Sequence, residues 1–187
     1  MIEQVYNAFL GCDQKVTTDT RNIAKNDLFF ALKGPNFNGN KFEEKALELG
    51  AKYAVIDEKE YFIEGKTFLV ENVLETLQNL ARHHREKINI PVVAITGTNG
   101  KTTTKELLGA VLTSQYNILI TEGNLNNHIG VPLTLLQLNK QHEIAVIEMG
   151  ASKIGDIKEL VEIALPNYGI ITNIGKAHLE GFGNVET

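Results

Sequence analysis

One run of residues in the middle of the chain, Thr96-Gly97-Thr98-Asn99-Gly100-Lys101-Thr102, combines the residue types that bind a triphosphate. Glycines allow a tight turn that points backbone N–H groups inward, and the N-terminus of a following helix adds positive potential. Lys101 would neutralise the β- and γ-phosphates, and the Thr102 hydroxyl would ligate Mg²⁺. The candidate nucleotide-binding residues are Gly97, Thr98, Asn99, Gly100, Lys101, Thr102 and Thr103.

This loop departs from the general pattern G-x-x-x-x-G-K-[ST], because Ile95 occupies the place of the first glycine. The shorter pattern G-x-x-G-K-T could also be a strand-to-helix turn that carries a surface lysine. An apolar strand over 91–96 and a helix over 101–114 are predicted on either side of it, and this context favours phosphate binding.

Two further polar residues follow predicted strands. Glu148 ends the strand 143–148, and open parallel sheets bind ligands at the carboxyl ends of their strands. A carboxylate there could bind Mg²⁺, or it could simply be solvated. His178 follows the strand 168–172 and could be either a functional group or a hydrogen-bonding surface residue.

The segment 121–132 is unusually rich in asparagine and glycine. The amides of Asn124, Asn126 and Asn127 offer donors and acceptors that suit an uncharged part of a substrate or phosphate oxygens. The alternative interpretation is an ordinary turn.

Strands and helices that could position these residues alternate from Pro91 onward, which predicts a doubly wound parallel sheet with helices on both faces. The strands are expected at 91–96, 117–121, 143–148 and 168–172, and the helices at 101–114, 131–137 and 154–164. The first block is expected to hold strands at 27–31, 53–56 and 67–70, helices at 41–49 and 72–87, and a turn-rich loop at 36–40. We therefore predict two α/β domains, residues 1–90 and 91–187.

Composition narrows the class of protein. The chain has 187 residues, 43% of them hydrophobic, and a net charge of −5 with both signs interspersed, which argues against a nucleic-acid partner. Its single cysteine excludes an internal disulfide framework. No apolar run is long enough for a membrane span and no secretory signal begins the chain, so we expect a cytoplasmic protein.

These segments together resemble the Mur ligase family. The residues that carry the resemblance are 19–21, 29–34, 95–105, 123–134, 148–151 and 171–183. The resemblance implies a small UDP-sugar-binding α/β domain followed by a P-loop ATPase domain. Within the family, the asparagine-rich segment and Asn173-Ile174-Gly175-Lys176-Ala177-His178 are similar to the branch that adds D-alanyl-D-alanine to UDP-N-acetylmuramoyl-tripeptide.

The resemblance also implies a reaction and its site. ATP would phosphorylate the tripeptide carboxylate, and the dipeptide amine would attack the acyl phosphate. Lys101, Glu148 and His178 would be catalytic, while Thr102, Glu148 and His178 would bind Mg²⁺. Thr20 and Arg21 would help to hold the UDP moiety, and Asn124, Asn126 and Asn127 would line the substrate side. Asn38-Gly39-Asn40 departs from a frequent Asp-Gly-His, which leaves open whether its side chains contact substrate.

Family members have a carbamoylated lysine after the metal-binding histidine, the rest of the ATPase domain and a C-terminal domain. Because the sequence stops at Thr187, we expect an N-terminal fragment that acts as a monomer and does not turn over alone. The alternatives are a sister amide ligase of the MurE, folylpolyglutamate or cyanophycin type, a non-catalytic P-loop module, and a bifunctional protein.

Overall fold

The computed structural model describes residues 1–175. The chain divides into two compact units, Met1–Leu80 and Ala81–Thr187. The division falls within helix α3 (Val73–Lys87), before the boundary at 90/91 that the sequence suggested.

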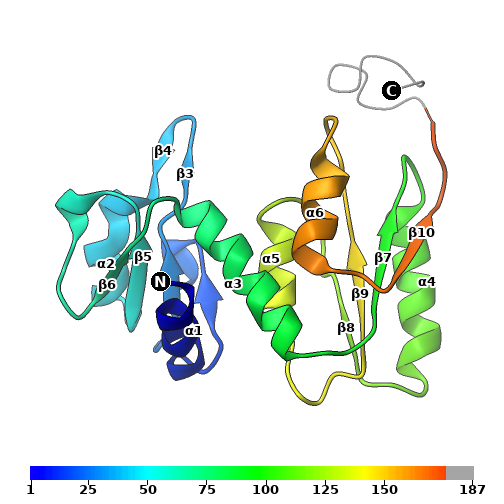
Figure 1. The fold of residues 1–187 in the computed structure, drawn as a ribbon, viewed down its shortest axis with the longest axis horizontal. Coiled ribbons are helices and arrows are strands. Elements are labelled where there is room, and N and C mark those ends of the chain that lie inside the picture. The colour runs from blue at the N-terminus through cyan, green and yellow to red at the C-terminus, as the bar shows by residue number, and fades with distance from the viewer. Residues whose placement is uncertain (176–187) are drawn as a thin grey trace. The chain divides into compact units, whose positions relative to one another are not determined.

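The first unit is built on a parallel sheet in the order β1-β2-β5-β6, with a separate antiparallel pair β3-β4 (Figure 1). Its strands are β1 (Val16–Thr17), β2 (Leu28–Phe30), β3 (Lys33–Gly34), β4 (Phe37–Asn38), β5 (Tyr53–Ile56) and β6 (Thr67–Leu69). Its helices are α1 (Ile2–Gly11), α2 (Glu43–Glu48), the start of α3, and the 3-10 turns η1 (Thr20–Asn22), η2 (Gly39–Phe42) and η3 (Lys59–Tyr61).

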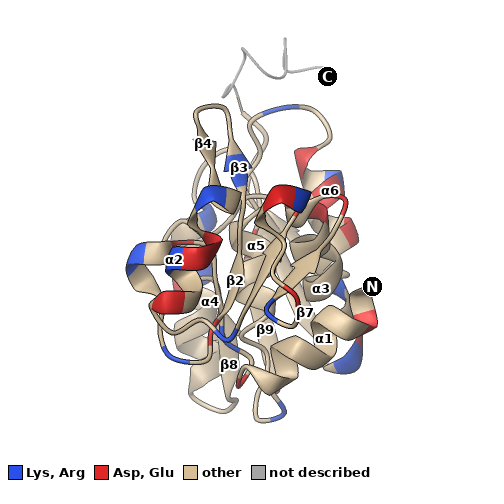
Figure 2. Ribbon diagram, turned by 90° about the vertical axis from the view of Figure 1, so that its left-hand side faces the viewer, with Lys and Arg blue, Asp and Glu red and all other residues tan. Residues whose placement is uncertain are grey.

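Both faces of this sheet are covered, since α2 lies on one side and α1 on the other (Figures 1 and 2). Successive strand residues point to opposite faces, so Phe29 and Ala54 share a core with Ala46 of α2. Leu28, Phe30 and Val55 are equally buried on the opposite side. The apolar runs of the sequence are therefore strands buried on both faces.

Several local features of the first unit were not predicted, among them strands β1 and β3. No element was expected at the N-terminus, yet α1 buries Val5, Tyr6, Ala8 and Phe9 at helical spacing. The turn-rich segment 36–40 contains strand β4 and the start of η2, and α2 consequently begins at Glu43. Charges of both signs occur along α2, with Lys45 among three glutamates (Figure 2).

The second unit contains a parallel sheet in the order β10-β7-β9-β8. Its strands are β7 (Val92–Thr96), β8 (Ile118–Ile120), β9 (Ile144–Glu148) and β10 (Tyr168–Ile171), and its helices are α4 (Lys101–Thr113), α5 (Gly130–Leu135), α6 (Asp156–Ala164) and the end of α3. The alternation predicted from the sequence is confirmed, with ends that differ by a few residues.

Three crossovers join these four strands, and the one through α4 runs in the opposite direction to those through α5 and α6. The chain passes from β7 through α4 over β9 to β8, and from β9 through α6 back over β7 to β10. Right-handed crossovers in opposite directions place their helices on opposite faces, and Figure 1 shows α4 on one side of the sheet and α6 on the other. The doubly wound arrangement is thus confirmed, and its loops diverge between the carboxyl ends of β7 and β9.

None of the helices within residues 1–175 is both long and apolar enough to cross a bilayer.

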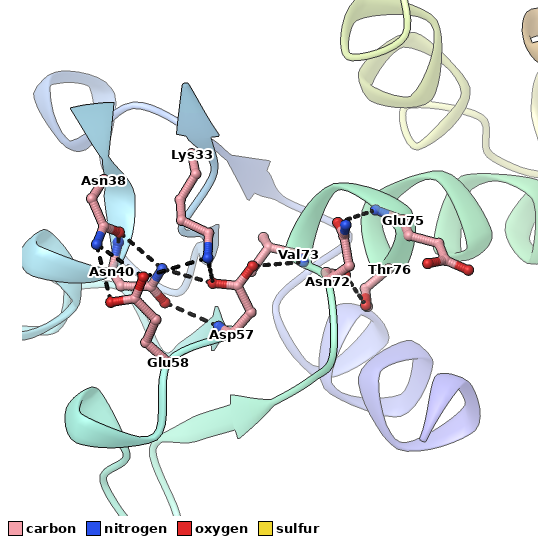
Figure 3. Close-up of polar contacts among 9 residues, drawn as sticks. All are labelled: Lys33, Asn38, Asn40, Asp57, Glu58, Asn72, Val73, Glu75 and Thr76. Carbon is pink, nitrogen blue, oxygen red and sulfur yellow. Dashed lines mark hydrogen bonds and ion pairs between the residues drawn. The ribbon is translucent and has the colours of Figure 1, made fainter. Parts of the chain in front are cut away.

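A network of polar side chains closes the carboxyl end of β5 in the first unit (Figure 3). Asp57 accepts hydrogen bonds from Asn40 Nδ2 at 2.8 Å and from Val73 N at 3.4 Å, and it pairs with Lys33 Nζ at 2.9 Å. Asn40 is fully buried and also accepts from Asp57 N through Oδ1. The network thereby ties the β3-β4 hairpin and the start of α3 to the end of β5.

This network gives the stability of the first unit a dependence on pH. Burial alone would raise the pKa of Asp57, but the hydrogen bonds from Lys33, Asn40 and Val73 outweigh it and hold that pKa below its usual value. A carboxyl whose pKa is lower in the folded state stabilises the fold above its unfolded-state pKa, about 3.9. That stabilisation is lost as the pH falls through the folded-state value.

Asp57→Asn should therefore destabilise the first unit by about 1–3 kcal/mol at pH 7, because a charged hydrogen-bond partner is lost. The difference from wild type should shrink below pH ~4. Urea unfolding between pH 3 and pH 7 measures this, with Glu71→Gln at an exposed position as the matched control. A difference that stays constant over that range would contradict the assignment.

Candidate nucleotide and metal site

The phosphate loop joins β7 to α4 through Gly97, Thr98, Asn99 and Gly100. Gly97 and Gly100 have φ values of +133° and +79°, which side chains rarely tolerate. Ile95, which stands where the longer motif has its first glycine, is fully buried inside β7. The loop is therefore short because the strand extends one residue beyond Ile95, and its helix begins at Lys101 directly after the left-handed Gly100.

The chain that follows β10 packs directly on this loop. Thr172 Oγ1 donates to Asn99 O at 2.6 Å, and Asn173 accepts from Asn99 N through Oδ1 at 2.9 Å and from Thr98 N through its carbonyl at 3.1 Å. A Cβ at Gly97 would collide with Thr172 Oγ1. Glycine is thus required at position 97 both by its φ and by this close approach.

Lys101 lies over the loop that it follows. Its Nζ is 2.7 Å from Gly97 O and 3.4 Å from Thr98 O. Thr102 and Thr103 are exposed in the first turn of α4, where the helix dipole favours an anion. The predicted phosphate-binding residues therefore form one continuous surface at the helix N-terminus.

Glu148 lies at the carboxyl end of the neighbouring strand, since β9 pairs with β7 in the register Ile95–Glu148. Glu148 is 2% exposed, and its Oε1 accepts from Asn126 Nδ2 at 2.8 Å. Oε2 is buried and has no hydrogen-bond partner among the described residues. A buried carboxylate oxygen without a partner costs free energy, and a hard cation such as Mg²⁺ would satisfy it.

The structure describes two of the three predicted metal ligands, Thr102 and Glu148. Residues 1–175 contain no group of three or more His, Cys, Asp or Glu that could hold a metal ion. His178, the predicted third ligand, lies outside the described residues. Glu148 and the Thr102 hydroxyl fit an oxygen-ligated ion that keeps several waters, as Mg²⁺ does.

A cavity of about 370 Å³ adjoins the loop, in the usual size range of ligand pockets. It brings together three of the predicted site residues, Lys101, Asn126 and Asn127. Ser152 from the β9-α6 connection, Asp156 and Glu159 from α6, and His128 also line it. Charged groups of both signs therefore meet in one hollow beside the phosphate loop.

The three predicted asparagines have different surroundings. Asn126 contacts Glu148, whereas Asn127 Oδ1 accepts from the backbone N–H groups of Ile129 and Gly130 at the start of α5. Asn124 is exposed, and its carbonyl accepts from Asn126 N. The segment is thus an ordered loop in which Asn127 organises a helix start, besides lining the cavity.

The first unit holds Thr20 and Arg21 in η1, just beyond the carboxyl end of β1. Asp19 accepts from Arg21 N and pairs with the Arg21 guanidinium, and these hydrogen bonds lower the pKa of Asp19 to about 2. The Arg21 side chain is 86% exposed, so it can reach a ligand. Asn38 and Asn40, by contrast, are engaged in the Asp57 network, and Asn40 is buried.

Several residues beside the site had no predicted role. Thr172 and Asn173 support the loop, while Thr121 Oγ1 accepts from Glu148 N at 2.9 Å. Lys105 is 1% exposed and donates to Thr121 O at 2.7 Å. The available signal was that Thr121 and Thr172 directly follow apolar strands, as the predicted residue Glu148 ends one.

Both parts of the chain match models of a single protein family. The model described as "Mur ligase family, catalytic domain" matches residues 14–95, and the "Mur ligase middle domain" matches residues 95–187. The chain belongs to the Mur ligase family. Its phosphate loop and Glu148 lie in the part matched by the Mur ligase middle domain, and Thr20 and Arg21 lie in the other part.

Curated and solved relatives agree with this assignment. The UDP-N-acetylmuramoyl-tripeptide–D-alanyl-D-alanine ligase of Haemophilus influenzae is 42% identical over 176 residues, which are 92% of this chain and 38% of the relative. A crystal structure of MurF from Acinetobacter baumannii has a TM-score of 0.86 at 38% identity, covering 92% of this chain and 38% of that one. MurF from Thermotoga maritima, solved in complex with ADP, has a TM-score of 0.84 at 38% identity over 94% of this chain and 41% of that one. This chain therefore spans about 38% of the length of the Haemophilus influenzae relative.

The contact of Thr172 with the loop leads to a prediction. Thr172→Val keeps the shape of the side chain but leaves Asn99 O without its hydroxyl donor. We expect ADP to bind about tenfold more weakly, corresponding to ~1.4 kcal/mol, near the upper end for one neutral hydrogen bond. Thr172→Ser retains the hydroxyl and should bind as wild type does. Titration calorimetry in the full-length protein measures both, and equal affinities in the two variants would refute the support role.

Proposed function

We propose that this chain supplies the UDP-sugar-binding and ATP-binding parts of a ligase that adds D-alanyl-D-alanine to UDP-N-acetylmuramoyl-tripeptide in peptidoglycan precursor synthesis. The observation that carries the proposal is the shared cavity, in which Lys101 of the phosphate loop and Asn126, the partner of Glu148, lie together. The names of the relatives support these substrates. ATP is split to ADP and phosphate in the proposed reaction.

The first step would transfer the γ-phosphoryl group. An oxygen of the tripeptide carboxylate attacks the γ-phosphorus, the bond to the bridging oxygen breaks, and ADP leaves. The loop amides and the Lys101 ammonium hold the triphosphate in line and neutralise charge that develops on it. Such a step needs positioning and electrostatic stabilisation more than a covalent nucleophile on the protein.

The second step would form the peptide bond. The amine of D-alanyl-D-alanine attacks the acyl carbon, a tetrahedral intermediate forms, and it collapses with loss of phosphate and of the amine proton. Lys101 lines the cavity in which the acyl phosphate would lie, with Asn126 and Asn127 on the substrate side. We also include exposed Asn124 among the substrate-side residues.

Glu148 and Thr102 would hold a magnesium ion through a carboxylate and a hydroxyl oxygen. The ion supplies neutralisation of the phosphate charge when it is bound. His178 is proposed as a further metal ligand, on the family resemblance alone. Lys101, Glu148 and His178 are the residues to which we assign catalysis.

The first unit is proposed to bind the UDP moiety, with Thr20 offering a hydroxyl and Arg21 an exposed guanidinium. The Arg21 guanidinium donates to Asp19 and remains largely exposed to solvent. We place the reaction in the cytoplasm, where ATP is available, and propose a monomer acting on small-molecule substrates.

The decisive test of the function is Lys101→Ala in the full-length protein. We expect product formation from ATP, UDP-N-acetylmuramoyl-tripeptide and D-alanyl-D-alanine to fall about 100- to 1000-fold, as when a preorganised charge-stabilising group is removed. Lys140→Ala, at an exposed lysine away from the loop, is the control and should retain full activity. Wild-type turnover by the Lys101 variant would overturn the proposal.

A second test addresses the first unit. Arg21→Ala should weaken binding of UDP-N-acetylmuramoyl-tripeptide about tenfold, the scale of one charge-assisted hydrogen bond, and leave ADP affinity unchanged. Arg21→Lys keeps the positive charge but replaces the planar guanidinium, so it should give an intermediate affinity for UDP-N-acetylmuramoyl-tripeptide. Calorimetry with each ligand separately distinguishes the two sites. A change in ADP affinity alone would argue against this assignment.

A further inference from the structure

The side chain of Glu148 is held at one oxygen only. Asn126 Nδ2 donates to Oε1 at 2.8 Å, and this is the hydrogen bond that the described residues make to the carboxylate. Oε2 is buried beside it without a partner within residues 1–175. Oε1 is therefore fixed in direction, and the buried Oε2 remains available to a ligand.

The backbone of Glu148 is secured by other residues. Glu148 N donates to Thr121 Oγ1, and Thr121 N donates to Val146 O in the adjacent strand. Lys105 Nζ donates to Thr121 O from α4 and is itself buried. Loss of the Asn126 amide would thus leave the strand end in place while freeing the carboxylate to rotate.

The position of the Asn126 amide is itself tightly restricted. Gly150 N donates to Asn126 O at 2.7 Å, and a Cβ at Gly150 would lie 3.0 Å from both Cγ and Oδ1 of Asn126. The amide therefore packs against the backbone at Gly150, just beyond the end of β9. A glycine there lets Asn126 approach closely enough to reach Glu148.

We propose that Asn126 is a positioning residue for the metal-binding carboxylate: it orients Glu148 so that Oε2 faces a divalent cation. This inference rests on the proposed function, which takes Glu148 as a metal ligand, and it gives Asn126 a role beyond lining the substrate side. A neutral amide donor suits this role because it fixes Oε1 without adding a positive charge that would repel the cation.

The physical basis is the effect of an outer partner on a metal ligand. A carboxylate that must be oriented on binding loses rotational freedom, whereas one already oriented does not. Removing such hydrogen-bond partners typically weakens metal affinity about 10- to 100-fold. Loss of this hydrogen bond lowers the affinity for the metal ion, and it need not change the affinity for substrate.

The test is a Mn²⁺ titration of the full-length protein in the presence of ADP, followed by electron paramagnetic resonance. Asn126→Ala should weaken Mn²⁺ binding about 10- to 100-fold in the absence of the tripeptide substrate. Gly150→Ala should shift Mn²⁺ affinity in the same direction by pushing the amide aside, without altering any polar group. Asn79→Ala, at an exposed position of α3, is the control and should leave Mn²⁺ affinity unchanged.

The outcomes separate this inference from the function on which it rests. Should Glu148→Gln leave Mn²⁺ affinity unchanged, the assignment of Glu148 as a ligand fails. Should Glu148→Gln weaken Mn²⁺ binding while both Asn126→Ala and Gly150→Ala bind as wild type, the positioning role fails and the ligand assignment stands. Loss of tripeptide-substrate affinity with normal Mn²⁺ binding in Asn126→Ala would make Asn126 a substrate contact instead. Thermal unfolding of each variant identifies any that fail to fold. If Asn126→Ala does not fold, the Mn²⁺ affinity of Gly150→Ala decides whether the positioning role holds.

Discussion

Parallel pairing of β7 with β9 is the interaction on which the site depends. Because Ile95 lies opposite Glu148, the phosphate loop after β7 and the carboxylate at the end of β9 emerge at the same edge of the sheet. A slip of one residue would turn Glu148 to the other face of the strand. Hydrogen bonds from Met149 N to Ile95 O and from Thr96 Oγ1 to Met149 O continue the pairing beyond the regular strands.

A third strand completes the same edge. The chain after β10 reaches the phosphate loop through Thr172 and Asn173, so three adjacent strands contribute their carboxyl ends to the site. The loops after β7 and β9 turn to opposite faces, which opens a crevice between them. Buried apolar strand residues, exemplified by Val146 and Ile147, anchor the sheet whose edge carries these polar groups.

The first unit uses the same edge of its sheet differently. The polar groups of the Asp57 network bind one another (Figure 3). Asn38 donates to Glu58, Asn40 donates to Asp57, and Lys33 offsets part of the negative charge of the two carboxylates. Asn38 and Asn40 therefore have a structural role here. They hold the β3-β4 hairpin to the end of β5. At the same end of the sheet, we propose that the exposed Arg21 binds the UDP moiety.

The amino-acid sequence alone was enough to predict the glycine-containing turn between β7 and α4, the four strands of the second unit and Glu148 at a strand end. In the first unit it predicted β2, β5 and β6 but not the short strands β1, β3 and β4. Glycine spacing, apolar runs and strand ends are local properties, set by the conformational limits and burial of neighbouring residues. Tertiary structure alone decided that Asn126 meets Glu148 across 22 residues and that Thr172 meets Asn99 across 73. It also decided the strand order and the burial of Lys105, because these follow from how distant segments pack, which no local pattern encodes.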